Sequence, residues 1–288
     1  MRCDLHVHTA HSGMCTVPGL SLFCRESYNE PRALYETLKR RGMDLVTVTD
    51  HDSIDAAEEL RSYPDFFLSE EVTCVLPSGA EMHAGVYGIS ERDHIELQRR
   101  RKDVPSLLAY AVEHRLFVTA NHIYSSLTGL RRGEDFATFA RDFHGIEAVN
   151  GHMLLCANRF AASFAERFSK PAIGGSDAHT LHCAGKTYTE VPHARTTEEF
   201  LLGLRRGRCL PGGESGDYWK LTGAVLSIGA ALIRQNRRWW PYAPLLSVLF
   251  GLAPIVTAGN YVRELAFAWY WGTVNRPVEP NAAMREIV

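Results

Sequence analysis

Apolar and polar positions alternate with two different periods along most of the chain. Short runs rich in β-branched and aromatic residues predict strands, near Arg2–Val7, Asp44–Thr49, Phe66–Thr73, Met82–Ile89, Leu116–Ala120, Gly145–Asn150 and Pro171–Gly174. Segments with helical spacing lie between several of them, at Pro31–Arg41, Ser106–Arg115, Glu134–Asp142, Leu154–Phe168 and Glu198–Arg206. Alternating strands and helices predict an α/β fold with a parallel sheet, either doubly wound or closed as a barrel. The glycine-rich signatures of nucleotide-binding open sheets are missing, which favours the barrel.

The pattern changes after the glycine-rich stretch 212–216, so we expect a barrel domain over residues 1–212 and an apolar helical tail over residues 213–288. Residues 239–262 carry no charge and follow Arg234, Arg237 and Arg238. A helix of that length could cross a bilayer of about 30 Å. The aromatic flanks and the preceding arginines predict membrane association with the barrel on the cytoplasmic side. The alternative is an apolar hairpin that packs on the barrel or forms a dimer core.

The composition bears on the partners of the protein and on its cellular compartment. The 288 residues are 45% hydrophobic and 22% charged, with a formal net charge of −2, so the whole chain has no general attraction to nucleic acid or anionic lipid. The seven cysteines show no regular spacing, which favours a reducing compartment. Arg2 and Asp4 stand where the apolar part of a secretory signal would begin, so we expect a cytoplasmic protein. The oligomeric state is left open.

Polar side chains suited to metal binding recur where the expected strands end. The first example is "DLHVHT", where His6 and His8 are two positions apart and therefore project to the same side of a strand. Comparable residues follow in "TVTDHDS", "SEEVT", "EMHAGVYG", "ANHIY" and "GGSDAHT". A lone histidine is more often structural than a ligand. In a parallel barrel, however, the carboxyl ends of all strands face one mouth, so this set predicts a common site.

These motifs resemble the PHP family, the polymerase and histidinol phosphatase domain superfamily of metal-dependent phosphoesterases. The matching stretches cover roughly residues 1 to 210 and read, in order, "DLHVHT", "TVTDHD", "EEVT", "HAGVYGI", "ANHIY", "GIEAVNG" and "GGSDAH". The resemblance implies a distorted (β/α)7 barrel that binds two or three divalent ions of zinc, manganese or iron.

The resemblance also implies a ligand set. A first metal would take His6, His8, Glu71 and Asp177, with Glu71 bridging to a second metal, which His83 and His122 complete. A third would take His51 and His179 with an Asp or His from the loop after the first strand. The sequence departs from the family pattern there, because Gly13 stands where the aspartate is expected and only His11 or Cys15 is offered as a substitute.

The residue types fit this chemistry independently. Mixed imidazole and carboxylate ligands suit zinc, manganese or iron, and a bridging carboxylate can hold two cations about 3.5–4 Å apart. We therefore expect a metal-bridged hydroxide to attack phosphorus, with His51, His179 and Asp177 as catalytic residues. Asp50 and Asp52 are expected to orient His51.

The sequence thus predicts a metal-dependent phosphoesterase acting on a phosphorylated small molecule or an accessible nucleic-acid end, with Arg25 and Lys186 as candidate substrate contacts. One alternative is an amidohydrolase-like hydrolase, although no lysine suits the bridging position used there. Another is a metal-binding module without catalysis, which the missing loop aspartate favours.

Overall fold

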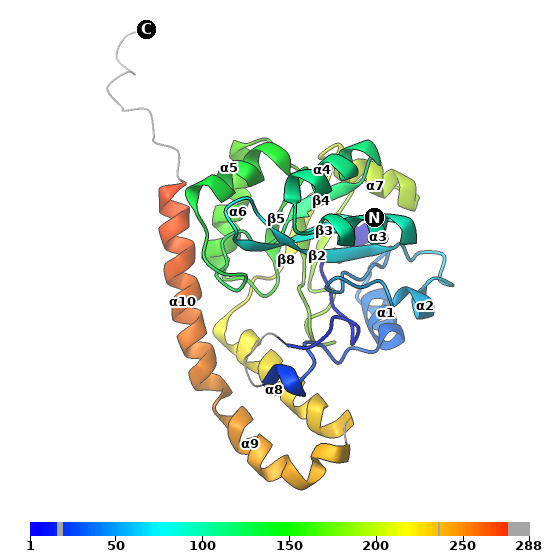
Figure 1. Ribbon diagram of the computed structural model, residues 1–288. Helices are drawn as coiled ribbons and strands as arrows, with labels where there is room; N and C mark the ends of the chain where they lie inside the picture. Colours follow the sequence, from blue (N-terminus) through cyan, green and yellow to red (C-terminus); the bar gives the residue numbers. More distant parts are fainter. Residues whose placement is uncertain (16–19, 236, 276–288) are drawn as a thin grey trace.

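The computed structural model describes residues 1–15, 20–235 and 237–275 as a mixed α/β structure with two sheets (Figure 1). The larger sheet has five strands in the order β2-β3-β4-β5-β6, which are Ser69–Val75, Glu81–Tyr87, Phe117–Ala120, Gly145–Asn150 and Ala172–Gly175. The smaller, antiparallel sheet has the order β1-β7-β8, which are Arg2–Cys3, Thr187–Glu190 and Leu210–Gly213. The predicted α/β class is confirmed, and β7 and β8 are additions to the prediction.

The pairing within the larger sheet differs from the all-parallel arrangement expected. β4, β5 and β6 are parallel, but β3 is antiparallel to both of its neighbours. Five residues, Leu76–Ala80, join β2 to β3, and a parallel crossover needs a dozen or more. The short connection therefore forces β3 to run back along β2.

Continuous strand pairing does not close a barrel within the described residues. The chain around Val7 and the chain around Val46 lie between the two edges of the larger sheet, where they make single bridges instead of ladders. Val7 bridges Ala178, just beyond β6, and accepts a hydrogen bond from the Thr49 amide at 2.9 Å. His51 then bridges Glu71 of β2. The strand expected at Asp44–Thr49 is reduced to these contacts.

Helices cover the sheets, and their bounds are Pro31–Arg40 (α1), Ala57–Leu60 (α2), Glu91–Arg100 (α3), Val104–Glu113 (α4), Gly133–Asp142 (α5), Leu155–Arg167 (α6) and Thr197–Arg205 (α7). The five expected helices are all present. The pattern missed α3 because its sequence is almost entirely polar and only Leu97 is buried. Ser90 starts that helix through a capping box with Asp93, a local signal that does not depend on burial.

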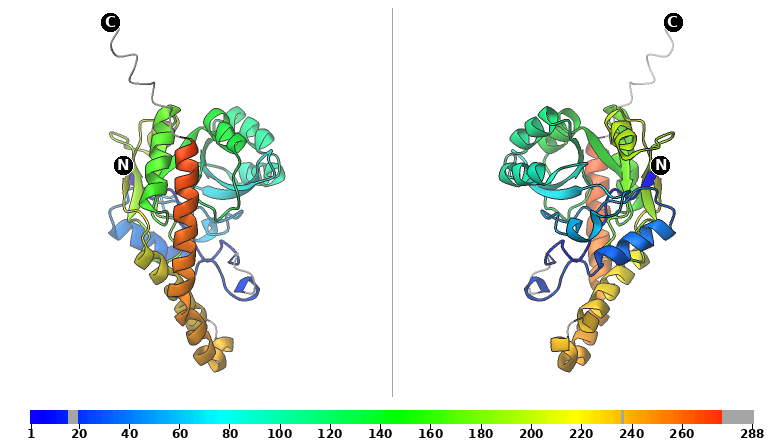
Figure 2. Two further views of the ribbon diagram at one scale, coloured as in Figure 1. Left: turned by 90° about the vertical axis from the view of Figure 1, so that its left-hand side faces the viewer. Right: turned by 90° about the vertical axis from the view of Figure 1, so that its right-hand side faces the viewer.

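The C-terminal segment forms α8 (Tyr218–Gln235), a 3-10 turn (Arg237–Tyr242), α9 (Ala243–Gly251) and α10 (Ala253–Val274). Figures 1 and 2 show α10 running along α6 while α9 lies at the far tip of the molecule. Gly272 makes close contact between the helices possible, since a Cβ there would come within 2.4 Å of the Phe160 ring. At least α10 therefore packs against the α/β body.

The uncharged stretch 239–262 is divided by this arrangement and is not one straight helix. Among the described residues, no single helix is both long and apolar enough to cross a membrane. Trp240–Val248 and Ala253–Val274 reach that length and apolar character only as a pair, with a bend of 51° between them. α10 also carries Asn260, Arg263 and Glu264, so the tail is less uniformly apolar than expected. The domain boundary at 212 and the membrane association stay predictions.

Candidate metal centre

The segment carrying His6 and His8 passes directly against the end of β6. A Cβ at Gly175 would lie 2.3 Å from the Cβ of His6, so the close approach requires glycine. The Asp177 amide donates a 2.6 Å hydrogen bond to the His6 carbonyl, and the His8 amide donates to Ala178. Both imidazoles are fully buried as a result.

Four of the expected ligands meet around one point. His6 Nε2 lies 3.1 Å from Glu71 Oε2 and 3.5 Å from Asp177 Oδ1. His8 Nε2 lies 3.5 Å and 3.4 Å from the same two oxygens. Ligand atoms arranged tetrahedrally around zinc at about 2.0–2.1 Å are about 3.4 Å apart. The spacing therefore matches donors that surround one cation.

Glu71 connects this group to the other expected ligands. Its Oε1 atom lies 3.4 Å from His122 Nε2 and 3.6 Å from His83 Nδ1. Its Oε2 atom, besides facing His6 and His8, lies 3.3 Å from His51 Nδ1. Glu70, the neighbouring residue in β2, points the other way and binds His94 at 2.8 Å. Glu71 thus occupies the position that a bridging carboxylate needs.

The third group contains a residue that sequence reasoning missed. His51 Nε2 and His179 Nε2 each lie 3.4 Å from a carboxylate oxygen of Glu26. The Glu26 amide donates a hydrogen bond to the Gly13 carbonyl at 3.2 Å. The chain therefore returns to the Gly13 position and supplies a carboxylate from further along the loop.

The two substitutes offered by the sequence do not join this group. Among the described residues, Glu26 lines the same cavity as His51 and His179, whereas His11 and Cys15 do not. One further cluster combines His152, whose role the sequence left open, with Asp177 and His179.

Carboxylates and amides behind the ligands hold them in place. Glu147 Oε1 lies 2.7 Å from His6 Nδ1. Asn121 donates to Glu71 Oε1 at 2.8 Å, and Asn150 donates to Asp177 Oδ2 at 3.0 Å. Such partners fix the ring orientation and raise the basicity of metal ligands. Glu147 and Asn150 lie inside "GIEAVNG", a motif that the sequence analysis noted without assigning roles.

The expected role of Asp50 is wrong. Its carboxylate accepts hydrogen bonds from the Thr9 amide at 2.6 Å and from Ser12 Oγ at 2.8 Å, and Ser12 Oγ also lies 2.8 Å from His8 Nδ1. Asp50 therefore organises the His8 loop and not His51. Asp52 likewise turns away from His51 and pairs with Arg101 at 2.6 Å.

Burial and the neighbouring charges together determine the pKa values in the cluster. Burial lowers the pKa of His8 to about 3, helped by the neighbouring His179. Burial also opposes protonation of His6, but the charges of Glu71, Asp177 and Glu147 outweigh it and raise the pKa of His6 well above its usual value. Burial opposes the charged form of Glu71, but the positive charges of the histidines beside it favour that form. The histidines outweigh burial, so the pKa of Glu71 lies well below its usual value. The site is thus built around negative charge.

The donor atoms fit a divalent metal. His8 Nε2, His51 Nδ1 and His179 Nε2 are buried and have no hydrogen-bond partner within the described part of the chain. Each nevertheless faces carboxylate oxygens at 3.3–3.5 Å. Buried polar atoms are normally satisfied, and a cation between these donors would satisfy them.

Two ligand positions carry backbone strain. His122 and Asp177 have φ values of 32° and 53°, in the left-handed region, which non-glycine residues seldom adopt and which recurs at functional sites. The hydrogen bonds of Asp177 to His6 and Asn150 help to hold that conformation.

The candidate substrate contacts lie outside the cluster. Arg25 is exposed and donates to the Ala10 carbonyl at 3.1 Å, and Lys186 lies 3.3 Å from His182 at the surface. Neither lines the cavity of about 320 Å³ into which Glu26, His51, His83 and His122 project. Their contact with substrate stays a prediction.

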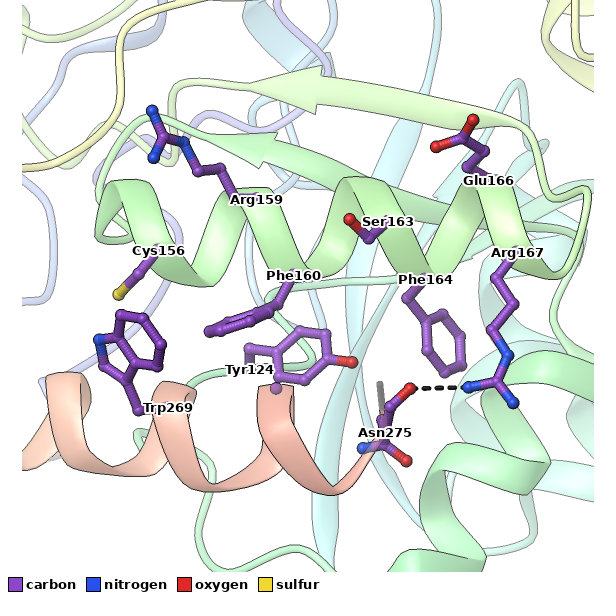
Figure 3. A pocket seen from close by; sticks show the side chains of 11 residues that line it. Tyr124, Cys156, Arg159, Phe160, Ser163, Phe164, Glu166, Arg167, Trp269 and Asn275 are labelled. Carbon is purple, nitrogen blue, oxygen red and sulfur yellow. Dashed lines mark hydrogen bonds between the residues drawn. The ribbon is translucent and has the colours of Figure 1, made fainter. Parts of the chain in front are cut away.

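A second cavity, of about 630 Å³, is remote from these ligands and lies between α6 and α10. Figure 3 shows Phe160 of α6 facing Tyr124, Trp269 on α10, and Arg167 bound to the Asn275 carbonyl. Within the described part of the chain, its lining includes no member of the histidine and carboxylate clusters.

The fold and these clusters together define an α/β protein with a candidate divalent-metal centre. The model of the PHP-associated family matches residues 156–209, which include "GGSDAH". The crystal structure of a two-domain Bacteroides vulgatus protein containing a predicted PHP-like metal-dependent phosphoesterase is similar, with a TM-score of 0.55 and 20% identity over 74% of this chain and 64% of that one. PsfC from Pseudomonas syringae is similar too, with a TM-score of 0.52 and 19% identity over 72% of this chain and 93% of that one.

A sequence relative adds little about function. It is an uncharacterised protein of Methanocaldococcus jannaschii, 33% identical over 72 residues, which span 25% of this chain and 41% of the relative. The family model thus matches one part of this chain, residues 156–209, and the two crystal structures share its fold.

Proposed function

We propose that the protein is a metal-dependent phosphoesterase that holds two or three divalent ions. The observation that carries the proposal is the convergence on one site of three donors far apart in sequence: His6, Glu71 and Asp177, with N–O separations of 3.1 and 3.5 Å. Isolated bridges around Val7 and His51 support a distorted barrel as the scaffold.

Three groups of side chains would hold the ions. They are His6, His8, Glu71 and Asp177; Glu71, His83 and His122; and His51, His179 and Glu26. Bound metal would supply Lewis acidity and an activated water for attack on phosphorus. The products are inorganic phosphate or a phosphomonoester, and an alcohol whose oxygen takes up a proton.

The hydrogen bonds of His179 determine which of its nitrogen atoms is available. Nδ1 lies 3.0 Å from the Asp177 carbonyl, which can only accept, so Nδ1 carries the hydrogen. In the neutral ring, Nε2 then presents a lone pair toward Glu26. This favours His179 as a ligand over a proton donor to the leaving oxygen, and its catalytic role, like that of His51 and Asp177, stays a prediction.

The same geometry bears on the two alternatives. Among the described residues, no lysine lines the cavity into which the candidate ligands project, and Glu71 stands at the bridging position. Glu26 supplies a carboxylate for the group that lacks the loop aspartate, which weakens the argument for a module without catalysis.

The test combines metal content with turnover. We expect purified protein reconstituted with manganese or zinc to bind at least two ions per chain and to hydrolyse p-nitrophenyl phosphate. His8→Ala and Asp177→Ala should lose both properties, whereas His182→Ala, which alters a histidine beside Lys186 at the surface, should retain them. Bound metal without turnover on any phosphoester, or turnover on an amide, would contradict the proposal.

A further inference from the structure

A smaller cavity, of about 240 Å³, adjoins the metal centre and is walled by the C-terminal helices. Leu127, Asp177 and His179 line both this cavity and the one that contains the other ligands. We propose that the substrate is a phosphoester with an apolar organic group, aliphatic or aromatic, and that this group lies in the smaller cavity while the phosphate lies at the histidine cluster. This inference rests on the proposed function and names the substrate class.

α8 provides an apolar wall. Its residues at the cavity are spaced i, i+3, i+4 and i+7, which places them on one face of the helix, and they are Leu221, Ala224, Val225 and Ile228. Met153 and Leu154, which precede α6, and Ala157 in its first turn face the same space. A sugar or other polyhydroxylated group would leave hydroxyls unpaired against this wall, which disfavours its binding there.

α10 provides the opposite wall, through Thr257, Asn260, Tyr261 and Glu264. The Glu264 carboxylate has a hydrogen-bond partner, and the Tyr261 ring has a packing partner. Glu264 accepts a hydrogen bond from the Ser126 amide at 3.1 Å, and the Tyr261 ring packs edge-on to Tyr218. The Glu264 carboxylate would also repel a second anionic group on the ligand. The wall therefore disfavours nucleoside polyphosphates and accepts an uncharged group.

The size of the cavity agrees with a short chain or a ring. An apolar cavity of about 150 Å³ is enough to bind benzene, and this one is larger. Since Asp177 and His179 form its inner end, an ester oxygen at the metal centre would direct the organic group between α8 and α10. The C-terminal helices, which the family-model match to residues 156–209 does not include, would thus select the substrate.

Binding of non-hydrolysable alkylphosphonates tests the cavity on the full-length, metal-reconstituted protein. Titration calorimetry with ethyl-, butyl- and hexylphosphonate should show the Kd falling by up to about fourfold for each methylene buried. Ala224→Phe should fill the cavity and abolish this dependence. Ala230→Phe, on an exposed position of the same helix, should preserve it. Equal affinities for ethyl- and hexylphosphonate in the unmodified protein would overturn the inference.

A second variant guards against misfolding of Ala224→Phe. Val225→Ser changes a side chain that is 40% exposed, so the fold should tolerate it. This variant should weaken hexylphosphonate severalfold and leave ethylphosphonate unchanged. An unchanged preference for the hexyl compound in a folded Val225→Ser protein would contradict the assignment of this wall.

Turnover separates this inference from the proposed function and identifies the source of the substrate. The protein could hydrolyse p-nitrophenyl phosphate and yet turn over hexyl phosphate no faster than glycerol 3-phosphate. That result would overturn the inference and leave the proposed function standing. Phosphonate binding that depends on chain length, without hydrolysis of any phosphoester, would support the inference and contradict the proposed function. Hydrolysis of soluble hexyl phosphate alone assigns a free phosphoester, whereas phosphate release from phosphatidic acid in phosphatidylcholine vesicles assigns a lipid.

Discussion

The carboxylate of Glu26 lies 3.4 Å from His179 Nε2 and, through its other oxygen, 3.4 Å from His51 Nε2. Burial disfavours charge on this carboxylate, but the two imidazoles outweigh it and hold the pKa of Glu26 well below its usual range. The pairing places a charged acid opposite two histidines in the group where the expected loop aspartate is replaced by Gly13. A third metal position is thereby possible without that aspartate.

Replacement of Glu26 should remove one bound ion selectively. In Glu26→Gln, His51 and His179 lose the charged carboxylate that lies 3.4 Å from each of them, while His6, His8 and Asp177 keep their contacts. We expect metal analysis by mass spectrometry to show one ion fewer per chain than in the unmodified protein. Glu30→Gln, at the exposed start of α1, is the control. Unchanged stoichiometry in Glu26→Gln would exclude Glu26 as a ligand.

Glu147 should act on metal affinity through His6. In the unmodified protein, Glu147 Oε1 lies 2.7 Å from His6 Nδ1. Glu147→Gln keeps an acceptor oxygen at this position but removes the negative charge. Loss of such a supporting carboxylate costs about 10–100-fold in metal affinity. Competition with a fluorescent chelator measures the change, and Glu166→Gln on the exposed side of α6 should show none. Equal affinities in the two variants would mean that Glu147 has only a structural role.

Metal removal should destabilise the protein. The cluster gathers the buried carboxylates of Glu71, Asp177 and Glu147. A cation that binds only the folded state stabilises it by about 2.7 kcal/mol at a hundredfold excess over its Kd. Chelation should therefore lower Tm by about 5–10 °C in a thermal scan. Added zinc or manganese should restore it. Asp177→Ala should show a much smaller response, and a full response in that variant would place the stabilising ion elsewhere.

An ion pair remote from the site predicts a pH-dependent part of the stability. Burial disfavours the charged form of Asp65, but Lys39 at 2.5 Å and the Tyr35 hydroxyl at 2.6 Å outweigh it and lower the pKa of Asp65. A lowered folded-state pKa stabilises the protein above the unfolded value of about 3.9, and this contribution is lost as the pH falls through the folded value. Asp65→Asn should thus have a lower Tm than the unmodified protein at pH 7, and the difference should shrink below pH ~4. A difference that does not depend on pH would show that the charge is not responsible.

Much of the site could be predicted from the sequence because its signals are local. The alternation of His6 and His8 in an extended segment places them on one side, and the order of strands and helices brings "TVTDHDS", "SEEVT" and "GGSDAHT" to one region. All eight expected ligands converge in the structure. The positions of six strands, β1 to β6, and of five helices also follow from short-range patterns of apolar and polar residues.

Only the tertiary structure decided how the loops and tail complete this site. Glu26 reaches His179 because its backbone bonds to Gly13, and Asp50 binds Thr9 and Ser12 instead of His51. β3 runs antiparallel because of its short connection, and α8 and α10 wall a cavity beside Asp177. Local periodicity determines which way a side chain faces within its own element, but the partner that it meets depends on contacts between segments far apart in the chain.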